Sequence, residues 1–527
     1  MSLTGFLHAA HLGASLPAHR GLVRALADPE RAQRRRLAVI LGHLARNQGW
    51  GAMAPGASYE VFREQIQPCT YVDLEGTLEA QRNSGLALAS PARIRWQPTS
   101  GSTSRRKWIP YPPVFLSELD AAVGAWMVDL ALRHPRAFRG RHYWSLSWVP
   151  SELRQGGMEA DDLTLLPAWK RLALGRAMAV PNAVGGLPSN AEAMLASAAW
   201  LASRSDLSLL SVWSPTFGFA LLRALSEHRE AIAETLESGS WSLPLPAPRN
   251  RKAAGLLREW DGQLAAPFFA ELWPRLSLLS AWDSAGSQSH ARQLGALLPQ
   301  AHLQGKGLWA TEGVVTIPFQ EQLPLALTSH FLEFRCLATG RILPAWELQV
   351  DQELQPLLTT SAGLLRYALD DCVKVTGFLQ RTPCLAFQGR LGGTDMVGEK
   401  LDARAVAALL EALAKEHGIR CFTLFALESD PPHYCLLAEG ASASLHGIGS
   451  ALEAALCTFH HYRLARELLQ LGSAEVLLVP DGAAFLARRA ELRGSTSGEA
   501  KLQPLEVWGL RASPHQLAQP SPNSAPH

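Results

Sequence analysis

The stretch that decides the fold class is Pro98-Thr-Ser-Gly-Ser-Thr-Ser-Arg-Arg-Lys-Trp-Ile-Pro110. Within it, a glycine and small hydroxyl residues run directly into three consecutive cations. The N–H groups and hydroxyls of such a loop can converge on phosphate oxygens, and a following cation neutralises their charge. The common phosphate-loop pattern needs a glycine directly before the lysine, but Arg106 stands there and Trp108 follows Lys107. Taken alone, the stretch therefore fits a surface turn better than a phosphate site.

Length and composition indicate a globular protein with at least two domains. The chain has 527 residues, of which 47% are hydrophobic and 18% charged, and one core rarely serves more than about 300 residues. The net charge of +2 gives no strong field for nucleic acid or an anionic membrane, so we expect neither as a partner. Seven cysteines without a C-x-x-C pair fit no disulfide framework. Without a signal-peptide pattern or an apolar run of about 18 residues, the chain is expected to be cytoplasmic, and we expect a monomer.

The order of expected elements divides the chain after Arg390. Helical patterns dominate up to about residue 280, and short apolar runs between turns predict strands from about 300 to 390. Leu391-Gly-Gly-Thr-Asp395 is typical of a flexible junction. We expect a large N-terminal domain over 1–390, a small α+β domain over 391–511 and a disordered, Pro- and Ser-rich tail over 512–527. In the small domain we expect helices at 403–415 and 450–469, and strands at 421–427, 434–438 and 475–479.

Hydrolase and zinc patterns are absent from the sequence. Gly494-Ser-Thr-Ser-Gly498 has Thr496 where a G-x-S-x-G nucleophile would be a serine, and no H-E-x-x-H occurs. His460 and His461 are adjacent on an expected helix and point to different faces, so they are poor joint metal ligands. Each is expected to be a surface or packing residue.

Three polar positions are unusual for simple scaffold. Glu312 lies between small residues ahead of an expected strand, where a carboxylate can bind Mg²⁺ or be an exposed turn residue. Asp371 ends an expected strand, where it can accept two ribose hydroxyls or serve as an ordinary cap. Lys501 lies on a loop near the end of the small domain, where lysine is usually solvated.

In their order along the chain, these stretches resemble the auxin-responsive acyl-acid amido synthetase family of plants and its bacterial relatives. That family belongs to the adenylate-forming superfamily with firefly luciferase. The resemblance runs from Gln33 to about Pro504. It is carried by the phosphate loop quoted above, Lys306-Gly-Leu-Trp-Ala-Thr-Glu-Gly313, Gly363 to Gly377, Phe387-Gln-Gly-Arg390 and Gly398-Glu-Lys-Leu401. Two further segments, Trp213-Ser-Pro-Thr-Phe217 and Tyr143-Trp-Ser-Leu-Ser147, are typical of the bacterial branch, so we expect a bacterial member.

The resemblance implies a mixed α/β fold: a large adenylate-forming domain with β-sheets flanked by helices, and a small mobile α+β domain. It implies ATP- and Mg²⁺-dependent activation of a carboxylic acid as acyl-AMP, followed by transfer to an amine or amino acid. Lys501, Glu312 and Thr311 would be catalytic, with Glu312 also the metal ligand. ATP would be bound by Thr99, Ser100, Gly101, Ser102, Thr103, Lys107, Asp371 and Arg390. The acyl pocket would include Tyr143, Ser145, Trp213, Ser214 and Pro215.

The sequence departs from the family pattern at several positions. Ser104 replaces a glycine, Asp370 stands at the glycine before the ribose aspartate, and Phe459 lies near a common asparagine. Beside Phe459, Tyr462 and Arg466 keep the family's Tyr-x-x-x-Arg pattern. Two alternatives therefore stay open. One is an acyl-AMP-forming ligase that transfers to CoA or a carrier-protein thiol, and the other is a degenerate member that binds nucleotide without turnover.

Overall fold

The structure is a computed structural model. It describes residues 3–45, 57–84, 94–98, 107–145, 175–284, 287–391, 393–439, 447–480, 482–492, 504–510 and 512–518. The chain divides into two compact units, which are described separately. The large unit comprises Met1–Thr99 and Trp108–Gln388, and the small unit comprises Ser100–Lys107 and Gly389–His527.

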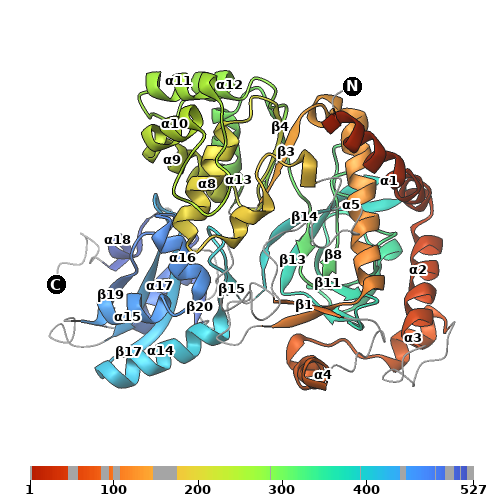
Figure 1. Cartoon of the computed structure of the whole chain (residues 1–527). Coiled ribbons are helices and arrows are strands. Elements are labelled where there is room, and N and C mark those ends of the chain that lie inside the picture. Colours follow the sequence, from red (N-terminus) through yellow and green to blue (C-terminus); the bar gives the residue numbers. More distant parts are fainter. Residues whose placement is uncertain are drawn as a thin grey trace. The chain divides into compact units, whose positions relative to one another are not determined.

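A four-stranded parallel sheet forms one half of the large unit. Its strands lie in the order β3 (Arg141–Trp144), β4 (Leu207–Ser211), β5 (Leu278–Ser280) and β6 (His302–Gln304). All five residues of β4 are buried, as expected for a parallel strand covered on both faces. Figure 1 shows the helices of this half grouped beside the sheet. They are η3 (Asn182–Gly186), α8 (Asn190–Ala202), α9 (Pro215–Glu227), α10 (Arg229–Ser238), α11 (Arg251–Glu259), α12 (Ala266–Leu272) and α13 (Gln288–Leu297).

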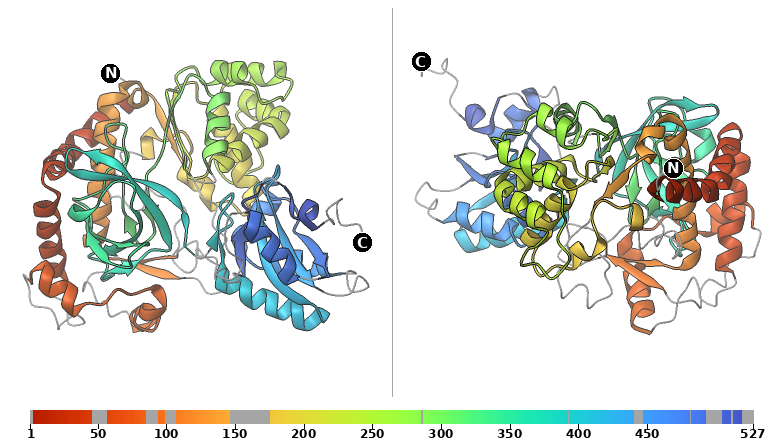
Figure 2. Two further views of the ribbon diagram at one scale, coloured as in Figure 1. Left: turned by 180° about the vertical axis from the view of Figure 1, so that it is seen from behind. Right: turned by 45° about the horizontal axis from the view of Figure 1, so that its top comes forward.

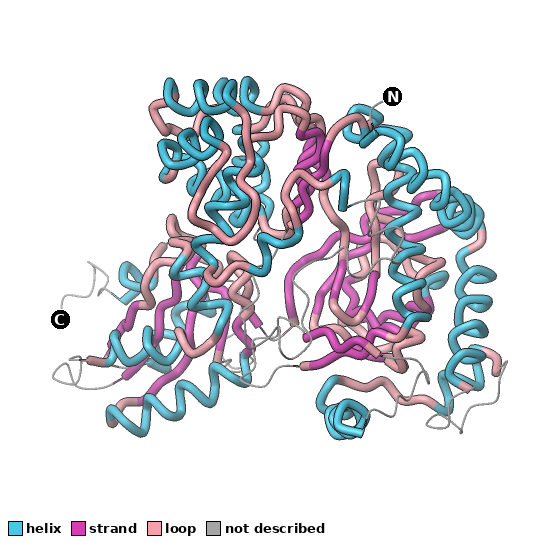
Figure 3. The backbone as a smooth tube through the Cα atoms, viewed as in Figure 1, coloured by secondary structure: helices cyan, strands magenta, loops and turns pink. Residues whose placement is uncertain are grey.

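An antiparallel sheet forms the other half, as the short apolar runs between 300 and 390 predict. Its strand order is β10-β9-β11-β13-β14, with β12 paired to β11. Figure 3 shows these strands in magenta beside the longer helices of this half. Their bounds are β9 (Phe331–Cys336), β10 (Ile342–Pro344), β11 (Glu353–Thr359), β12 (Tyr367–Ala368), β13 (Asp371–Leu379) and β14 (Thr382–Arg390), with η5 (Ala345–Glu347) after β10.

Helix α5 (Pro113–Arg133) is the central helix of this half, since apolar side chains from nearly all of its length enter the core. Helix α1 packs along it, and Figure 2 shows both beside the antiparallel sheet. Among the described residues, no helix combines the length and apolarity needed to cross a membrane. The remaining helices here are α1 (Leu3–Ala27), α2 (Pro29–Leu44), α3 (Tyr59–Gln65), α4 (Tyr71–Ser84) and η1 (Pro135–Phe138).

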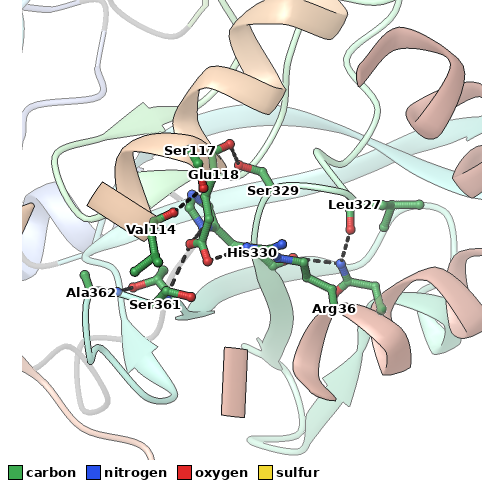
Figure 4. A network of polar contacts seen from close by, with 11 residues as sticks. Arg36, Val114, Ser117, Glu118, Leu327, Ser329, His330, Ser361 and Ala362 are labelled. Carbon is green, nitrogen blue, oxygen red and sulfur yellow. Dashed lines mark hydrogen bonds and ion pairs between the residues drawn. The ribbon is translucent and has the colours of Figure 1, made fainter. Parts of the chain in front are cut away.

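A buried polar network joins α5 to the antiparallel sheet (Figure 4). The carboxylate of Glu118, in α5, accepts a hydrogen bond from His330 Nδ1 at 2.9 Å and one from the backbone N–H of Ser361 at 3.3 Å, and it forms an ion pair with Arg36. Ser329 Oγ donates to the Glu118 carbonyl at 2.7 Å. Burial by itself raises the pKa of Glu118, but the interactions with His330 and Arg36 lower it by more than burial raises it. The net pKa therefore lies below the ordinary value.

The small unit is built on a four-stranded sheet whose two faces are both apolar. The order is β19-β18-β17-β20, with β17 antiparallel to β18 and the outer pairs parallel. Leu424 and Ala426 of β17 pack on one face, while Phe425 and Leu427 pack on the other, as alternation along a strand requires. The strands are β15 (Gly393–Thr394), β16 (Leu401–Asp402), β17 (Arg420–Leu427), β18 (His433–Glu439), β19 (Glu475–Val479) and β20 (Leu505–Val507).

Two expectations for the small unit are wrong. The single helix expected at 450–469 is two helices, α15 (Ile448–Leu456) and α16 (His460–Glu467), because Phe459 adopts an extended backbone and begins a new helix. The tail expected to be disordered from residue 512 instead contains α18 (Pro514–Ala518). Ser513 and Gln516 form reciprocal backbone–side-chain hydrogen bonds at its start, and Leu517 is buried. The other helices are α14 (Ala403–His417) and α17 (Gly482–Leu492).

Replacing Glu118 with alanine is expected to lower the free energy of unfolding by about 3–5 kcal/mol, since His330 and Arg36 lose their shared buried carboxylate. Chemical unfolding followed by circular dichroism at pH 7 measures the loss. The exposed Glu64 of α3 is the matched control, and its alanine variant should remain within about 0.5 kcal/mol of the parent.

The same comparison has a pH dependence with a defined sign. The folded pKa of Glu118 is lowered, so its contribution is complete above the unfolded value of about 4.3 and is lost as pH falls through the folded pKa. The stabilities of the parent and Glu118→Ala should therefore converge in acid. A difference that stays constant as the pH is lowered would contradict the assigned ion pairs.

Candidate functional site

The turn between β7 (Trp309–Ala310) and β8 (Gly313–Val314) carries Thr311 and Glu312. The hydroxyl of Tyr111 donates to the carbonyl oxygen of Thr311 at 2.7 Å. The hydroxyl of Tyr367 donates to Glu312 Oε1 at 3.3 Å. Burial raises the pKa of Tyr367 well above the ordinary value, and the Glu312 carboxylate adds to the effect, so the phenol stays a donor. Three segments that are distant in the sequence therefore meet at this turn.

A glycine is required at the end of the turn. Gly313 has φ +154°, and a Cβ atom there would lie 2.9 Å from His330 Nε2. His330 is fully buried and belongs to the Glu118 network. Any side chain at Gly313 would therefore clash with His330 and disturb the Glu118 network, which packs against the turn.

The position of Tyr367 depends on the residue before it. Arg366 makes a two-pronged ion pair with Glu333, with Nε at 2.9 Å from Oε2 and Nη2 at 3.0 Å from Oε1. Its Nη1 donates to the carbonyl oxygens of Arg63 and Ile66 at 3.1 and 2.7 Å. The backbone of Arg366 has φ +49°, a conformation that costs energy for a residue with a side chain. These contacts hold that conformation and direct Tyr367 towards Glu312.

Asp371 and Asp370 occupy different environments. Asp371 begins β13 and is 6% exposed, whereas Asp370 is exposed to solvent. Arg390 is the last residue of β14, and its side chain lies outside the described part of the structure. Two strands flank the predicted phosphate loop: β1 (Arg95–Pro98) and β2 (Trp108–Tyr111). They pair antiparallel, with Pro98 opposite Trp108.

Of the predicted phosphate-binding residues, Lys107 belongs to the described part of the structure. Lys107 lies directly before β2 and is partly buried. The other predicted residues of the loop and the predicted catalytic lysine lie outside the described residues: Thr99, Ser100, Gly101, Ser102, Thr103 and Lys501.

A second group gathers at the carboxyl ends of the parallel strands, where ligands bind in many open α/β sheets. Trp144 and Ser145 lie at the end of β3, Trp213 and Ser214 follow β4, and Lys306 follows β6. Lys306 is only 3% exposed. Its Nζ lies 2.6 Å from the hydroxyl oxygen of Ser211, at the end of β4, and 4.7 Å from the centroid of the Trp213 ring. The group therefore combines aromatic surface with one buried cation.

Two of the predicted pocket residues are buried. Tyr143 is fully buried and packs in the hydrophobic cluster of the parallel sheet. Its neighbour Trp144 points to the opposite side, and its ring centroid lies 6.0 Å from Lys306 Nζ. Pro215 is buried at the start of α9, while Trp213 and Ser214 remain partly exposed.

Four residues of these groups were missed by the sequence reasoning: Tyr111, Trp144, Lys306 and Tyr367. Trp144, Lys306 and Tyr367 lie inside quoted motifs, so their place in a motif was a usable signal. Nothing in the local sequence marks Tyr111, because its contact with Thr311 joins segments 200 positions apart.

Motif residues of the small unit form internal contacts. The carboxylate of Glu399 accepts hydrogen bonds from the N–H groups of Met396 and Val397 at 2.8 Å, and from the hydroxyl of Tyr434. Tyr462 and Arg466, which keep the family's Tyr-x-x-x-Arg pattern, both bind the carboxylate of Glu453. These motif residues therefore hold the small unit together.

Replacing Arg366 with methionine is expected to cost about 3–5 kcal/mol of unfolding free energy, since Glu333 is left buried without its cation. Burial raises the pKa of Glu333 and Arg366 opposes that rise. Without Arg366, the pKa of Glu333 in the folded protein moves further above its value in the unfolded chain. The loss of unfolding free energy in Arg366→Met therefore grows as the pH rises towards this folded pKa. Chemical unfolding at pH 5.5 and 7.5 measures both effects. Arg335→Met, which removes one hydrogen bond to Gln355 on the same sheet, should cost about 1 kcal/mol; an equal loss in both variants would refute the role of the pair.

Comparisons with known proteins identify relatives of this chain. The GH3 family N-terminal domain matches residues 18–303, the central domain 323–390 and the C-terminal domain 403–505. A search of curated proteins gives no match. The structure titled "AtGH3.15 acyl acid amido synthetase in complex with 2,4-DB" has a TM-score of 0.63 and 17% identity over 94% of each chain. The structure titled "GH3.15 acyl acid amido synthetase" has a TM-score of 0.60 and 17% identity over 91% of this chain and 92% of its own.

The likeness to these structures confirms the predicted mixed α/β fold. The three domain matches cover most of the sequence in the order in which the motifs occur. They confirm the resemblance that the motifs indicated, and the chain belongs to the GH3 family.

Proposed function

We propose that this chain is an ATP-dependent acyl-acid amido synthetase. The oxygen of a carboxylic acid attacks the α-phosphorus of ATP, which gives acyl-AMP and releases pyrophosphate. An amine, in the first place that of an amino acid, then attacks the acyl carbon, and AMP leaves. The observation that carries the proposal is the contact between Tyr367 and Glu312, which joins two motif segments of the family. Membership of the GH3 family supports it.

Glu312 is the proposed ligand of Mg²⁺. It is partly exposed and oriented by one hydrogen bond from Tyr367, and Mg²⁺ prefers one or two carboxylates together with phosphate oxygens, so the donor set fits. The ion supplies neutralisation of phosphate charge when it is bound. Thr311, whose carbonyl oxygen accepts a hydrogen bond from Tyr111, is the proposed contact to the α-phosphate or the acyl carboxylate.

The other proposed roles follow the family pattern. Asp371 accepts hydrogen bonds from the ribose hydroxyls, and Arg390 supports Asp371. The phosphates are bound by Thr99, Ser100, Gly101, Ser102, Thr103 and Lys107. Lys501 bridges the acyl carboxylate and the α-phosphate during adenylation. No side chain becomes covalently attached to substrate, so the rate depends on positioning and on charge stabilisation.

The acid is proposed to be apolar or aromatic. The rings of Trp213 and Trp282 lie 5.7 Å apart at the ends of the parallel strands, and apolar walls with few polar groups are typical of small-molecule pockets. Ser145 and Ser214 lie at the same ends and can accept or donate hydrogen bonds to the ligand.

We place the enzyme in a reducing compartment, the cytoplasm, as a monomer. All seven cysteines are free thiols. Burial raises the pKa of Cys435 to about 12 and that of Cys69 to about 11, so these thiols are poorly reactive.

The decisive experiment is acid-dependent exchange of pyrophosphate into ATP with a panel of aromatic and aliphatic acids. At least one acid should support exchange, and Lys501→Ala should reduce the rate by about 100-fold or more, because it removes a charge that acts in the transition state. No exchange with any acid, or wild-type exchange in the Lys501 variant, would refute the mechanism. With the activated acid, an amide product supports the proposal, whereas a thioester formed with CoA contradicts it.

A matched pair of variants tests the ribose assignment. Asp371→Asn is expected to lower kcat/KM for ATP by about 10- to 100-fold, since a hydrogen bond to a charged group contributes about 1.5–3 kcal/mol. Asp370→Asn, one position away and exposed, should change kcat/KM less than about twofold. If the Asp370 variant is the impaired one, the ribose ligand has been assigned to the wrong residue.

A further inference from the structure

Two histidines and a glutamate from three separate segments of the large unit converge on its surface. His134 directly follows α5, His302 begins β6, and Glu321 lies in the turn that follows Phe319. His134 Nε2 lies 3.2 Å from Glu321 Oε1, and His302 Nε2 lies 3.5 Å from Oε2. The two imidazole rings are stacked with their centroids 4.4 Å apart. The potential ligand atoms all lie within 4.8 Å of one another.

The backbone holds the glutamate in this position. Gln320 and Glu321 have φ +52° and +58°, respectively, and Phe319 and Gln322 exchange hydrogen bonds at 2.9 and 3.1 Å across them. This is the geometry of a two-residue hairpin turn that usually contains glycine or asparagine. Asp129 Oδ2 accepts the N–H of Gln320 at 2.9 Å. The turn is therefore held by α5, the helix that His134 directly follows.

The three side chains match the chemistry of a transition-metal site. Two imidazole nitrogens and a carboxylate are frequent zinc ligands, at bond lengths of about 2.0–2.2 Å in tetrahedral geometry. Ligand atoms at such bond lengths lie about 3.3 Å apart, close to the observed nitrogen–oxygen separations of 3.2 and 3.5 Å. The two separations involve different oxygens of Glu321, and the potential ligand atoms lie within 4.8 Å of one another, so the side chains would draw closer together to hold an ion. His302 and Glu321 are also half-exposed, which leaves room for water as a fourth ligand.

We propose that His134, His302 and Glu321 bind a divalent transition metal, with zinc as the reference ion. The bound ion joins the end of α5, the edge strand of the parallel sheet and the hairpin turn. Phe319, beside the turn, packs in the cluster around α5, and Leu303, beside His302, packs on the cluster of the parallel sheet. The ion therefore cross-links the two halves of the large unit. It is separate from the Mg²⁺ assigned to Glu312, because the two ligand sets share no residue.

The test uses the full chain without a polyhistidine tag, treated with chelator and then titrated with ZnCl₂ by calorimetry. A second group in the small unit, Cys435, Glu475 and His515, could also take zinc, so all proteins carry His515→Gln. In that background we expect one equivalent of zinc to bind, and His302→Gln to abolish this binding. The exposed His228 gives the matched control, and its glutamine variant should bind zinc like the parent.

Thermal unfolding gives an independent readout. Zinc at 100 times its Kd should raise the Tm of the large unit by about 3 °C. The rise should disappear in His302→Gln and remain in His228→Gln, and MgCl₂ should not reproduce it. The proposal is overturned if zinc does not bind, if His302→Gln binds it like the parent, or if Mg²⁺ gives the same shift. Pyrophosphate exchange reports on the proposed function separately, so either proposal can fail alone.

Discussion

The buried ion pair between Arg366 and Glu333 is the constraint on which the candidate site of the large unit depends. A pair at this depth is stable only when the remaining donors are also satisfied, and here the guanidinium also binds two backbone carbonyls of the segment before α4. It therefore joins β9, the N-terminal helices and the strand that carries Tyr367. The phenol reaches Glu312 because the preceding residue is held on three sides. Such preorganisation is what a site needs when catalysis depends on placing charges rather than on a covalent nucleophile.

The sequence allowed those parts of the fold to be predicted in which one local pattern dominates. The strand at 475–479 and the helix beginning at 403 were found with little or no error, because alternation and helical spacing are clear there. The division of the helix expected at 450–469 into two was not predicted, because Cys457-Thr458-Phe459 contains no glycine or proline, the residues that usually indicate the end of a helix. The tail helix was missed because a proline can begin a helix as well as prevent one.

The candidate site was predictable to the extent that motifs carry it. Glu312 and Asp371 were proposed from their motifs, but the contacts around Glu312 were not predicted, since they join segments that are far apart in the sequence, as the hydrogen bond from Tyr367 shows. The burial of Tyr143 could not be predicted, because both faces of a parallel strand are apolar and no pattern distinguishes the fully buried residue from its partly exposed neighbour. Motifs also mix two kinds of residue. Glu399 and the Tyr462–Arg466 pair shape the small unit, and a sequence pattern cannot separate them from residues that touch substrate.

The two-sided core of the small unit has a consequence for how its strands find their partners. A slip of β18 by one residue would exchange Tyr434 and Leu436 for Cys435 and Leu437, and both pairs would still be buried, so hydrophobicity cannot select the alignment. Tyr434 supplies the missing information. Its hydroxyl pairs with Thr394 at 2.7 Å and with Glu399, neither of which belongs to the four-stranded sheet. Only one alignment brings the phenol to both partners. A single buried hydroxyl therefore distinguishes the native register from the register shifted by one residue, which would bury equally apolar side chains.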